Sequence, residues 1–192
     1  MNLAPLLSLI GSVEAPKGFD QVYGGSAIVP HRPITGMTVK EVRDWQQRSV
    51  EAGSRSSAAG RFQIIRRTLD ALVSKGVVTW GDRFDKDNQT RMAVALMKGR
   101  GLDDFTAGKM SAKAFANNLA KEWASMPVVT PIQGRWRRLQ PGETYYAGDG
   151  LNKALVTPDE VLAAIRQIPE RLGFWARLWA WLQDVIAMIH RT

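Results

Sequence analysis

The segment SVEAPKGFDQVYGG, residues 12–25, places one carboxylate, Glu14, where an apolar run meets a glycine-containing loop. Burial raises the pKa of a carboxyl group, because desolvation disfavours its charged form. A glutamate in such surroundings can serve as a general acid near neutral pH, and the cleavage of a glycosidic bond is one reaction that needs such an acid. From this segment alone, a solvated glutamate at the end of a helix is the alternative interpretation.

The composition limits the other kinds of chemistry. The chain has 192 residues, which fits one domain with its own core. It contains no cysteine and only two histidines, so we expect no disulfide, no thiol nucleophile, no metal site and no cofactor. The formal net charge of +8 favours a polyanionic partner such as an anionic envelope, or serves solubility alone. No basic and aromatic nucleic-acid motif accompanies this charge, so we expect no nucleic-acid partner.

The elements that must position Glu14 are mostly helices. Apolar spacing and capping residues predict helices over residues 5–14, from Thr38, through 68–73, over 87–98, from Ser111 through Trp123, and from Thr157 to about 168. Thr38 with Glu41, and Thr157 with Glu160, are predicted capping boxes. Residues 19–37 mix aromatic, β-branched, glycine and proline residues, which predicts a small hairpin or loop. The predicted fold class is therefore α+β and predominantly helical, with a small β-hairpin region.

Several segments that follow Glu14 carry a resemblance. SSAAGRFQI, LAKEWASMP and a Tyr-Tyr-Ala-Gly loop occur in this order along the chain. The pattern resembles the lysozyme-like superfamily of peptidoglycan-cleaving enzymes, and within it the phage endolysins of the bacteriophage lambda type, which are lytic transglycosylases. The similar part runs from about residue 3 to about residue 167. The resemblance implies a lysozyme-like catalytic domain over residues 1–168.

The resemblance also implies roles for individual residues. Glu14 lies at the catalytic position of the family and would be the acid and base. Gly60, Phe62 and Gln63 of GRFQI would line the cleft. Gln63 would offer its amide to an N-acetyl group or hydroxyl of a sugar, in keeping with the fixed polar groups and flat apolar faces of saccharide sites.

Three further residues are candidates near the acid. Ser57 would donate a hydrogen bond near Glu14 or would be only a loop residue. Tyr145 or Tyr146 resembles the tyrosine that orients the glutamate in related transglycosylases, and we prefer Tyr146. A packed aromatic residue is the alternative for either tyrosine.

A second carboxylate would decide the reaction. Retaining and inverting hydrolases place two carboxylates beside the scissile bond. Phage lysozymes commonly show Glu and Asp at a wider spacing than Glu14 and Asp20 have here, followed by Thr at the spacing that Asp20 and Ser26 have. Asp20 and Ser26 are therefore only possible helpers, and Asp20 is alternatively the cap of a turn. With one carboxylate, transglycosylation to 1,6-anhydro-MurNAc ends is the preferred reaction, and hydrolysis by a muramidase stays open.

The segment over residues 169–192 differs from the rest of the chain. It is rich in tryptophan, with Trp175, Trp179 and Trp181, and its polar residues recur seven positions apart. This pattern predicts an amphipathic helix with a wide apolar face. The helix would dock on the catalytic domain, lie in a membrane interface through its tryptophans, or span a membrane.

The predicted function follows from these interpretations. We expect an endolysin that cleaves the MurNAc–GlcNAc β-1,4 bond of bacterial peptidoglycan during host lysis, acting as a monomer. The first residues, MNLAPLLSLIGSVEA, lack the positive region of a standard signal peptide. We therefore expect synthesis in the host cytoplasm and action in the periplasm or cell wall. A non-catalytic peptidoglycan-binding or membrane-tethered scaffold is the alternative of another class.

Overall fold

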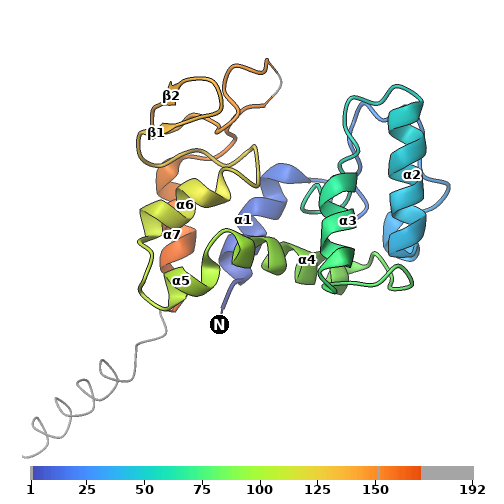
Figure 1. Cartoon of the computed structure of the whole chain (residues 1–192), viewed down its shortest axis with the longest axis horizontal. Helices are drawn as coiled ribbons and strands as arrows, with labels where there is room; N and C mark the ends of the chain where they lie inside the picture. Colours follow the sequence, from blue (N-terminus) through green and yellow to red (C-terminus); the bar gives the residue numbers. More distant parts are fainter. Residues whose placement is uncertain (1, 151, 170–192) are drawn as a thin grey trace, which may run out of the picture.

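The computed structural model describes residues 2–150 and 152–169, and this part of the chain is mostly helical with one short sheet (Figure 1). The helices are α1 (Ala4–Glu14), η1 (Ile34–Gly36), α2 (Val39–Glu51), α3 (Arg66–Ser74), α4 (Lys86–Gly99), α5 (Leu102–Thr106), α6 (Ala112–Leu119) and α7 (Pro158–Arg166). Strands β1 (Ile132–Gln133) and β2 (Arg138–Leu139) pair antiparallel, with Ile132 opposite Leu139. The predicted α+β, predominantly helical class is confirmed.

Local capping chemistry explains where two of these helices begin. The hydroxyl of Thr38 accepts from the backbone N–H of Glu41 at 3.2 Å, and the Glu41 carboxylate accepts from the N–H of Thr38 at 2.7 Å. Thr157 and Glu160 repeat the arrangement at 3.3 Å and 2.7 Å. Both predicted capping boxes are confirmed, and each satisfies two N–H groups that a helix start leaves without a partner.

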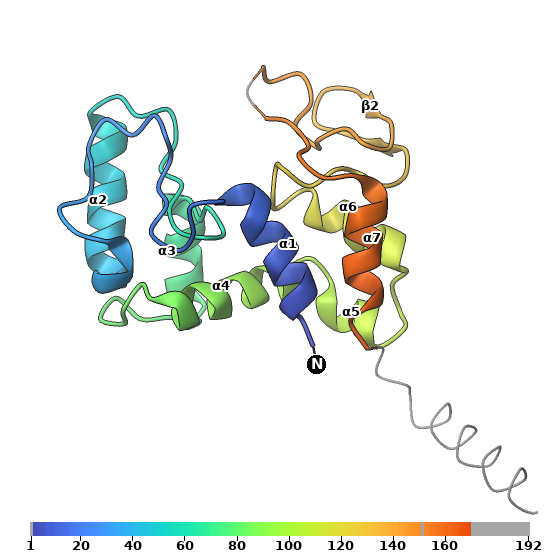
Figure 2. The same cartoon turned by 180° about the vertical axis from the view of Figure 1, so that it is seen from behind.

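Helix α1 lies between two halves of the molecule, as Figure 1 and the reverse view in Figure 2 both show. Helices α2 and α3 lie on one side of it, and α5, α6, α7 and the β1–β2 sheet lie on the other. One hydrophobic core joins the two sides and includes Leu6 and Ile10 of α1, Trp45 of α2 and Ile165 of α7. The C-terminal end of α1, which carries Glu14, therefore lies where the two halves meet.

Of the two predictions for residues 19–37, a small hairpin or a loop, the structure shows the loop. Residues 19–37 contain η1 and an isolated bridge between Val22 and Ala59, but no strand. Pro30 and Pro33 lack the N–H groups that a ladder of hydrogen bonds requires, so this segment runs as an irregular loop. The two-stranded sheet lies instead at residues 132–139.

Two helix predictions also differ from the structure. The helix that begins after Ser111 ends at Leu119, so Trp123 lies beyond it and donates its indole N–H to the carbonyl of Phe62 at 3.2 Å. The hydrogen-bond partner of Trp123 thus comes from a distant loop, so helical spacing alone cannot predict this contact. The short helix α5 was absent from the sequence prediction, because five residues are too few for a periodic pattern.

Within residues 2–150 and 152–169, no helix is long and apolar enough to cross a membrane. The predicted C-terminal helix with Trp175, Trp179 and Trp181 lies outside the described residues. Its three alternatives stay predictions.

A buried amide fixes the loop that contains the GRFQI motif. The side chain of Gln89, which is fully buried, donates to the carbonyls of Phe19 and Phe84 at 3.0 and 2.8 Å and accepts from the N–H of Arg61 at 2.8 Å. Gly60 packs on this amide with a φ of +78°, and a Cβ atom there would lie 2.7 Å from Cδ of Gln89. Position 60 therefore requires glycine for both its backbone angle and its space.

We predict that Gly60→Ala lowers the free energy of unfolding by roughly 2–4 kcal/mol, since left-handed backbone strain and overpacking add. Urea unfolding followed by circular dichroism measures this loss. Gly53→Ala is the matched control, because Gly53 has a φ of +102° but open space around it. We expect about 1 kcal/mol there. Equal losses in the two variants would show that the contact with Gln89 contributes nothing.

Candidate active site

Glu14 is the last residue of α1, and its carboxylate is only partly exposed. The backbone N–H and the hydroxyl of Ser125 both donate to Oε1 of Glu14, at 3.2 and 2.5 Å. Oε2 accepts no hydrogen bond from the part of the chain that the structure describes. Because both donors point to Oε1, the proton of the neutral carboxyl group belongs on Oε2.

Burial raises the pKa of Glu14, and the two hydrogen bonds from Ser125 offset this rise only in part. The position at the C-terminus of a helix acts in the same direction as burial, because the partial negative charge there disfavours a carboxylate. Glu14 therefore holds its proton to higher pH than an exposed glutamate does, as a general acid must.

Ser125 is the residue of this site that sequence reasoning missed. It lies inside the EWASMP segment that carries the resemblance, but no periodicity or capping pattern assigns it a role. Its side chain is buried, and its carbonyl accepts from the N–H of Leu155 at 2.8 Å. The hydroxyl of Thr144 donates to the neighbouring carbonyl of Ala124 at 2.7 Å. These bonds hold Ser125 against the end of α1.

The loop with the GRFQI motif also lies against the end of α1, and Gln21 connects them. The carbonyl of Gln21 accepts from the N–H of Gly60 at 2.7 Å and from the Gln63 amide at 3.4 Å. The side chain of Gln21 donates to the carbonyl of Glu14 at 3.5 Å. The structure thus brings the predicted residues Glu14, Gly60 and Gln63 into one neighbourhood.

Gln63 has a left-handed backbone with φ of +47°, an unusual conformation for a residue other than glycine. Its amide N–H₂ donates to the carbonyl of Gly60 at 2.8 Å, which fixes the side chain. Its amide oxygen accepts no hydrogen bond from the described residues and so is free to accept one from a ligand. Such strained residues cluster at functional sites, which supports the binding role predicted for Gln63.

Phe62 differs from its prediction as a residue that lines a cleft. Its side chain is 3% exposed and meets the ring of Phe19 edge-on, with 6.3 Å between the centroids. The ring is part of the core and offers no open face to a ligand. A large aromatic side chain lowers the free energy most when it is fully buried, and here the loop folds over it.

Arg61 explains an unusual glycine within α1. The Arg61 side chain lies across Gly11, where a Cβ atom would come within 2.8 Å of Cγ of Arg61. Its guanidinium lies 5.6 Å from the ring centroid of Phe19 and donates to the carbonyl of Ala15 at 3.4 Å. The absence of a side chain at Gly11 thus leaves room for the Arg61 guanidinium, which donates to the carbonyl of Ala15, the residue that follows Glu14.

The two tyrosines hold the segment that leads to Ser125. The hydroxyl of Tyr146 donates to the carbonyl of Lys121 at 2.8 Å, and burial raises the pKa of Tyr146. The ring of Tyr145 packs edge-on against Tyr146 at 5.4 Å, and the ammonium of Lys121 lies 5.9 Å from its centroid. The predicted bond from Tyr146 to the glutamate is replaced here by its bond to Lys121. Ser125 orients the carboxylate instead.

Three other candidates serve the loops around the site. Ser57 is buried, and its hydroxyl accepts from the N–H of Arg66 at the start of α3, at 3.0 Å. The carboxylate of Asp20 accepts from the N–H of Thr35 at 2.8 Å. The hydroxyl of Ser26 bonds to that of Ser49 at 2.7 Å. The structure brings none of Ser57, Asp20 and Ser26 into a hydrogen bond with Glu14.

The described part of the chain contains no group of three or more histidine, cysteine, aspartate or glutamate residues arranged to hold a metal ion.

Comparison with models of protein families gives a match. The sequence model of the family described as Endolysin matches residues 11–150, which include Glu14, the GRFQI motif and Ser125. Comparison with curated proteins and with solved structures gives no significant match.

We predict that Glu14→Gln stabilises the protein at neutral pH. A carboxyl whose pKa is higher in the folded than in the unfolded state makes the free energy of unfolding fall as pH rises between the two values. Glutamine keeps an oxygen for the two Ser125 donors but does not ionise. The melting temperature of Glu14→Gln should exceed that of the wild type by roughly 2–4 °C at pH 7, and the difference should shrink at pH 4.

Glu51→Gln is the control, since Glu51 is an exposed residue at the end of α2, and its melting temperature should not change. A lower melting temperature for Glu14→Gln at pH 7 would mean that the fold stabilises the charged form of Glu14. Differential scanning calorimetry at both pH values decides between these outcomes.

Proposed function

Because the chain belongs to the endolysin family, we propose that it cleaves the MurNAc–GlcNAc β-1,4 bond of bacterial peptidoglycan with Glu14 as its single acid and base. Endolysins are peptidoglycan-degrading enzymes of phage lysis, so the family indicates the polymer. The observation that carries the choice of bond is the partly buried Glu14 carboxyl, whose pKa is raised and whose Oε2 is left open. A lysozyme-like catalytic domain over residues 1–168 is part of this proposal.

The first step is proton donation. Oε2 of Glu14 gives its proton to the glycosidic oxygen while the bond from that oxygen to C1 of the muramoyl sugar breaks. The sugar develops oxocarbenium character, and Glu14 becomes a carboxylate. The N–H and hydroxyl of Ser125 stabilise the new negative charge, because hydrogen bonds to an ionised acceptor are stronger than those to a neutral one.

The second step reverses the role of Glu14. Its carboxylate takes the proton of the C6 hydroxyl of the same muramoyl sugar, and the C6 oxygen forms a bond to C1. The product is a 1,6-anhydro sugar, no water is consumed, and Glu14 is again protonated. An internal hydroxyl is already held beside C1, which gives it a high effective concentration.

One observation supports this lytic transglycosylase reaction over a two-carboxylate hydrolysis. The carboxylate of Asp20 accepts a hydrogen bond from the N–H of Thr35, and no hydrogen bond among the described residues links it to Glu14. A hydrolytic muramidase would need a water in place of the C6 hydroxyl, with Asp20 or Ser26 as the helper. A non-catalytic scaffold would not need a carboxyl group with a raised pKa.

The remaining parts of the proposal concern binding and place of action. Gln63 accepts a hydrogen bond from an N-acetyl group or hydroxyl of the glycan through its free amide oxygen. The protein acts as a monomer, is made in the host cytoplasm and reaches the wall from the periplasmic side. A net charge of +8 suits an anionic envelope.

Analysis of the released fragments tests the reaction. Purified peptidoglycan is digested with the wild type and with Glu14→Gln, and the muropeptides are identified by mass spectrometry. We expect fragments lighter than hydrolysis products by one water molecule, and their loss in the variant by a factor of at least about 1,000. Ordinary reducing ends would establish a muramidase, and full activity of Glu14→Gln would refute Glu14 as the acid.

Asp20→Asn is the matched control, since asparagine keeps an oxygen for the N–H of Thr35 but removes the carboxylate. The proposal expects the same anhydro products at a rate within about twofold of the wild type. Loss of activity in Asp20→Asn together with reducing ends in the wild type would favour the two-carboxylate reaction.

The pH profile tests the role of Ser125. Its hydroxyl lowers the pKa of Glu14, so Ser125→Ala should raise that pKa further. Protonated Glu14 is the reactive form, so the decline of kcat/KM at high pH should move to higher pH. The maximal kcat/KM should fall roughly 10- to 100-fold, as expected when a charged group loses one hydrogen bond. Ser12→Ala, an exposed serine of α1, should change neither quantity, and a shift to lower pH in Ser125→Ala would contradict the assignment.

A further inference from the structure

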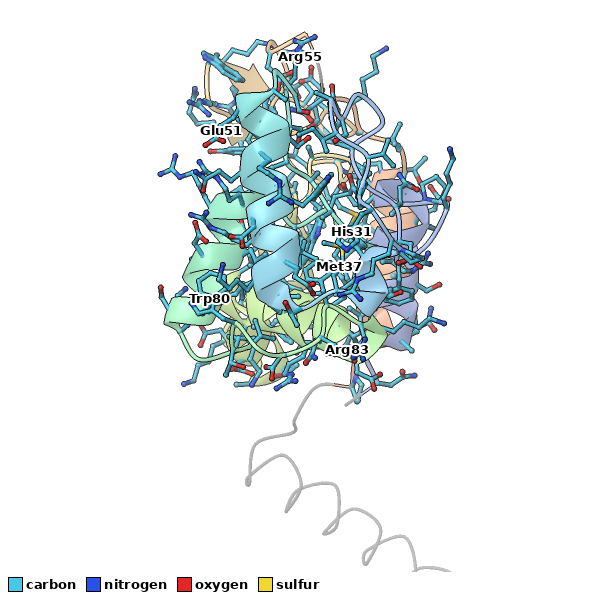
Figure 3. The ribbon with its side chains drawn as sticks, turned by 90° about the vertical axis from the view of Figure 1, so that its right-hand side faces the viewer. His31, Met37, Glu51, Arg55, Trp80 and Arg83 are labelled. Atoms are coloured by element: carbon cyan, nitrogen blue, oxygen red, sulfur yellow. The ribbon has the colours of Figure 1, made fainter. Side chains whose placement is uncertain are left out.

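A pocket of about 430 Å³ lies on the surface formed by α2, α3 and the turn before α4. Its lining residues are Lys40, Arg43, Asp44, Asp70, Ser74 and Trp80. Figure 3 places Trp80 beside the lower part of α2, on the outer flank of the molecule. None of these residues takes part in the hydrogen bonds around Glu14, so the pocket is separate from the candidate active site.

Ion pairs and backbone bonds form the walls of this pocket. Arg43 of α2 donates to the carboxylate of Asp70 of α3 at 3.1 Å, and Lys40 pairs with Asp44 at 2.6 Å. The carbonyl of Trp80 accepts from the N–H of Lys40 at 3.1 Å, which fixes the backbone that carries the indole. The site is thus already formed without a ligand, which lowers the entropy lost on binding.

The exposed indole of Trp80 is the feature that indicates a ligand-binding role for this pocket. Trp80 is 40% exposed, whereas Trp45 and Trp123 are 2% and 3% exposed in the core. An aromatic ring beside charged hydrogen-bonding groups is the combination that binds a flat apolar surface rimmed with hydroxyls. A sugar ring has both, since its C–H groups form a face and its hydroxyls lie around the edge.

The charges of the pocket indicate a neutral ligand. Two cations, Lys40 and Arg43, face two carboxylates, Asp44 and Asp70, so the formal charges of the lining cancel. An anionic stem peptide or a lipid headgroup would meet the carboxylates as well as the cations. A neutral sugar gains hydrogen bonds from both kinds of group and has no charge to desolvate.

We propose that this pocket is a second glycan-binding site, in which a neutral N-acetylated sugar of a peptidoglycan strand stacks on Trp80. The identity of the polymer rests on the proposed function. A strand held at this flank raises the effective concentration of bonds near Glu14, because the second binding event becomes intramolecular. The site therefore increases retention on the insoluble wall and leaves the chemistry at Glu14 unchanged.

A spectroscopic titration tests binding at this site alone. Glu14→Gln protein labelled with ¹⁵N is titrated with the soluble tetrasaccharide of N-acetylglucosamine, and the indole N–H signals are followed by NMR. Trp80→Phe identifies the signal of Trp80. We expect this signal to shift at millimolar sugar while that of buried Trp45 stays fixed. An unshifted Trp80 signal, or one that moves with phosphatidylglycerol vesicles and not with the sugar, overturns the proposal.

Retention on insoluble peptidoglycan tests the consequence. In the Glu14→Gln background, Trp80→Ala should lower the fraction of protein retained on the wall at least about threefold. Trp80→Phe should restore most of this fraction. The difference between Trp80→Ala and its parent should persist at high salt. Val29→Ala, which shortens an apolar side chain that is 82% exposed in the loop before η1, is the control and should retain fully. Equal retention of Trp80→Ala and its parent refutes the site.

Activity separates this proposal from the proposed function. With Glu14 intact, Trp80→Ala should cleave soluble peptidoglycan fragments at the wild-type rate and the insoluble wall more slowly. If Glu14→Gln proves fully active, the proposed mechanism fails while the Trp80 titration still decides the pocket. If the wild type cleaves peptidoglycan and the Trp80 signal does not respond to the tetrasaccharide, only the second site fails.

Discussion

A carboxyl group at the C-terminal end of an apolar helix can leave water only if fixed donors replace the water molecules. In this protein both donors to Glu14 come from Ser125, which lies 111 residues further along the chain. Much of the fold can be understood as the means of keeping these two residues together. One core holds α1 between the two halves, the indole of Trp123 reaches across to the carbonyl of Phe62, and the N–H of Leu155 holds the carbonyl of Ser125 from the other side.

Buried side-chain amides connect the irregular segments of this fold by hydrogen bonds, as strand pairing does in other α+β folds. Gln46 of α2 donates to the carbonyls of Ser57 and Ile64 at 2.7 and 2.8 Å, and Gln89 of α4 bonds to the segments at Phe19, Arg61 and Phe84. Irregular loops leave backbone groups without ladder partners, and a buried amide satisfies several at once. The loop that carries Gln63 is therefore held by two helices that lie some distance away in the sequence, in addition to the antiparallel bridge between Ala59 and Ile64 that closes the loop.

The sequence predicts what local chemistry decides. Thr38 and Thr157 start helices because each has a glutamate three residues later, and Glu14 stands out because an apolar helix ends there beside a loop. Ser125 could not be derived in this way, because a small hydroxyl residue has no periodic signature and its partner is remote. The same limit explains Trp123, which helical spacing placed on α6 although a distant carbonyl binds its indole. It also explains Phe62, which the resemblance placed in the lining of the cleft and which the structure buries in the core.

Two features that lower the stability of the fold, Gly11 and the partly buried Glu14, lie close together near the C-terminal end of α1. Gly11 weakens the helix by roughly 1 kcal/mol relative to alanine, yet it makes room for the Arg61 side chain that reaches the carbonyl of Ala15. Glu14 is held where its charged form is disfavoured, so the folded state is less stable at neutral pH than it would be with a neutral side chain. Local inconsistencies of this kind are expected where function selects the residue. A solvated glutamate at a helix end would need neither the buried Ser125 nor a glycine in the preceding turn, and this contrast is the physical argument for the role that we propose for Glu14.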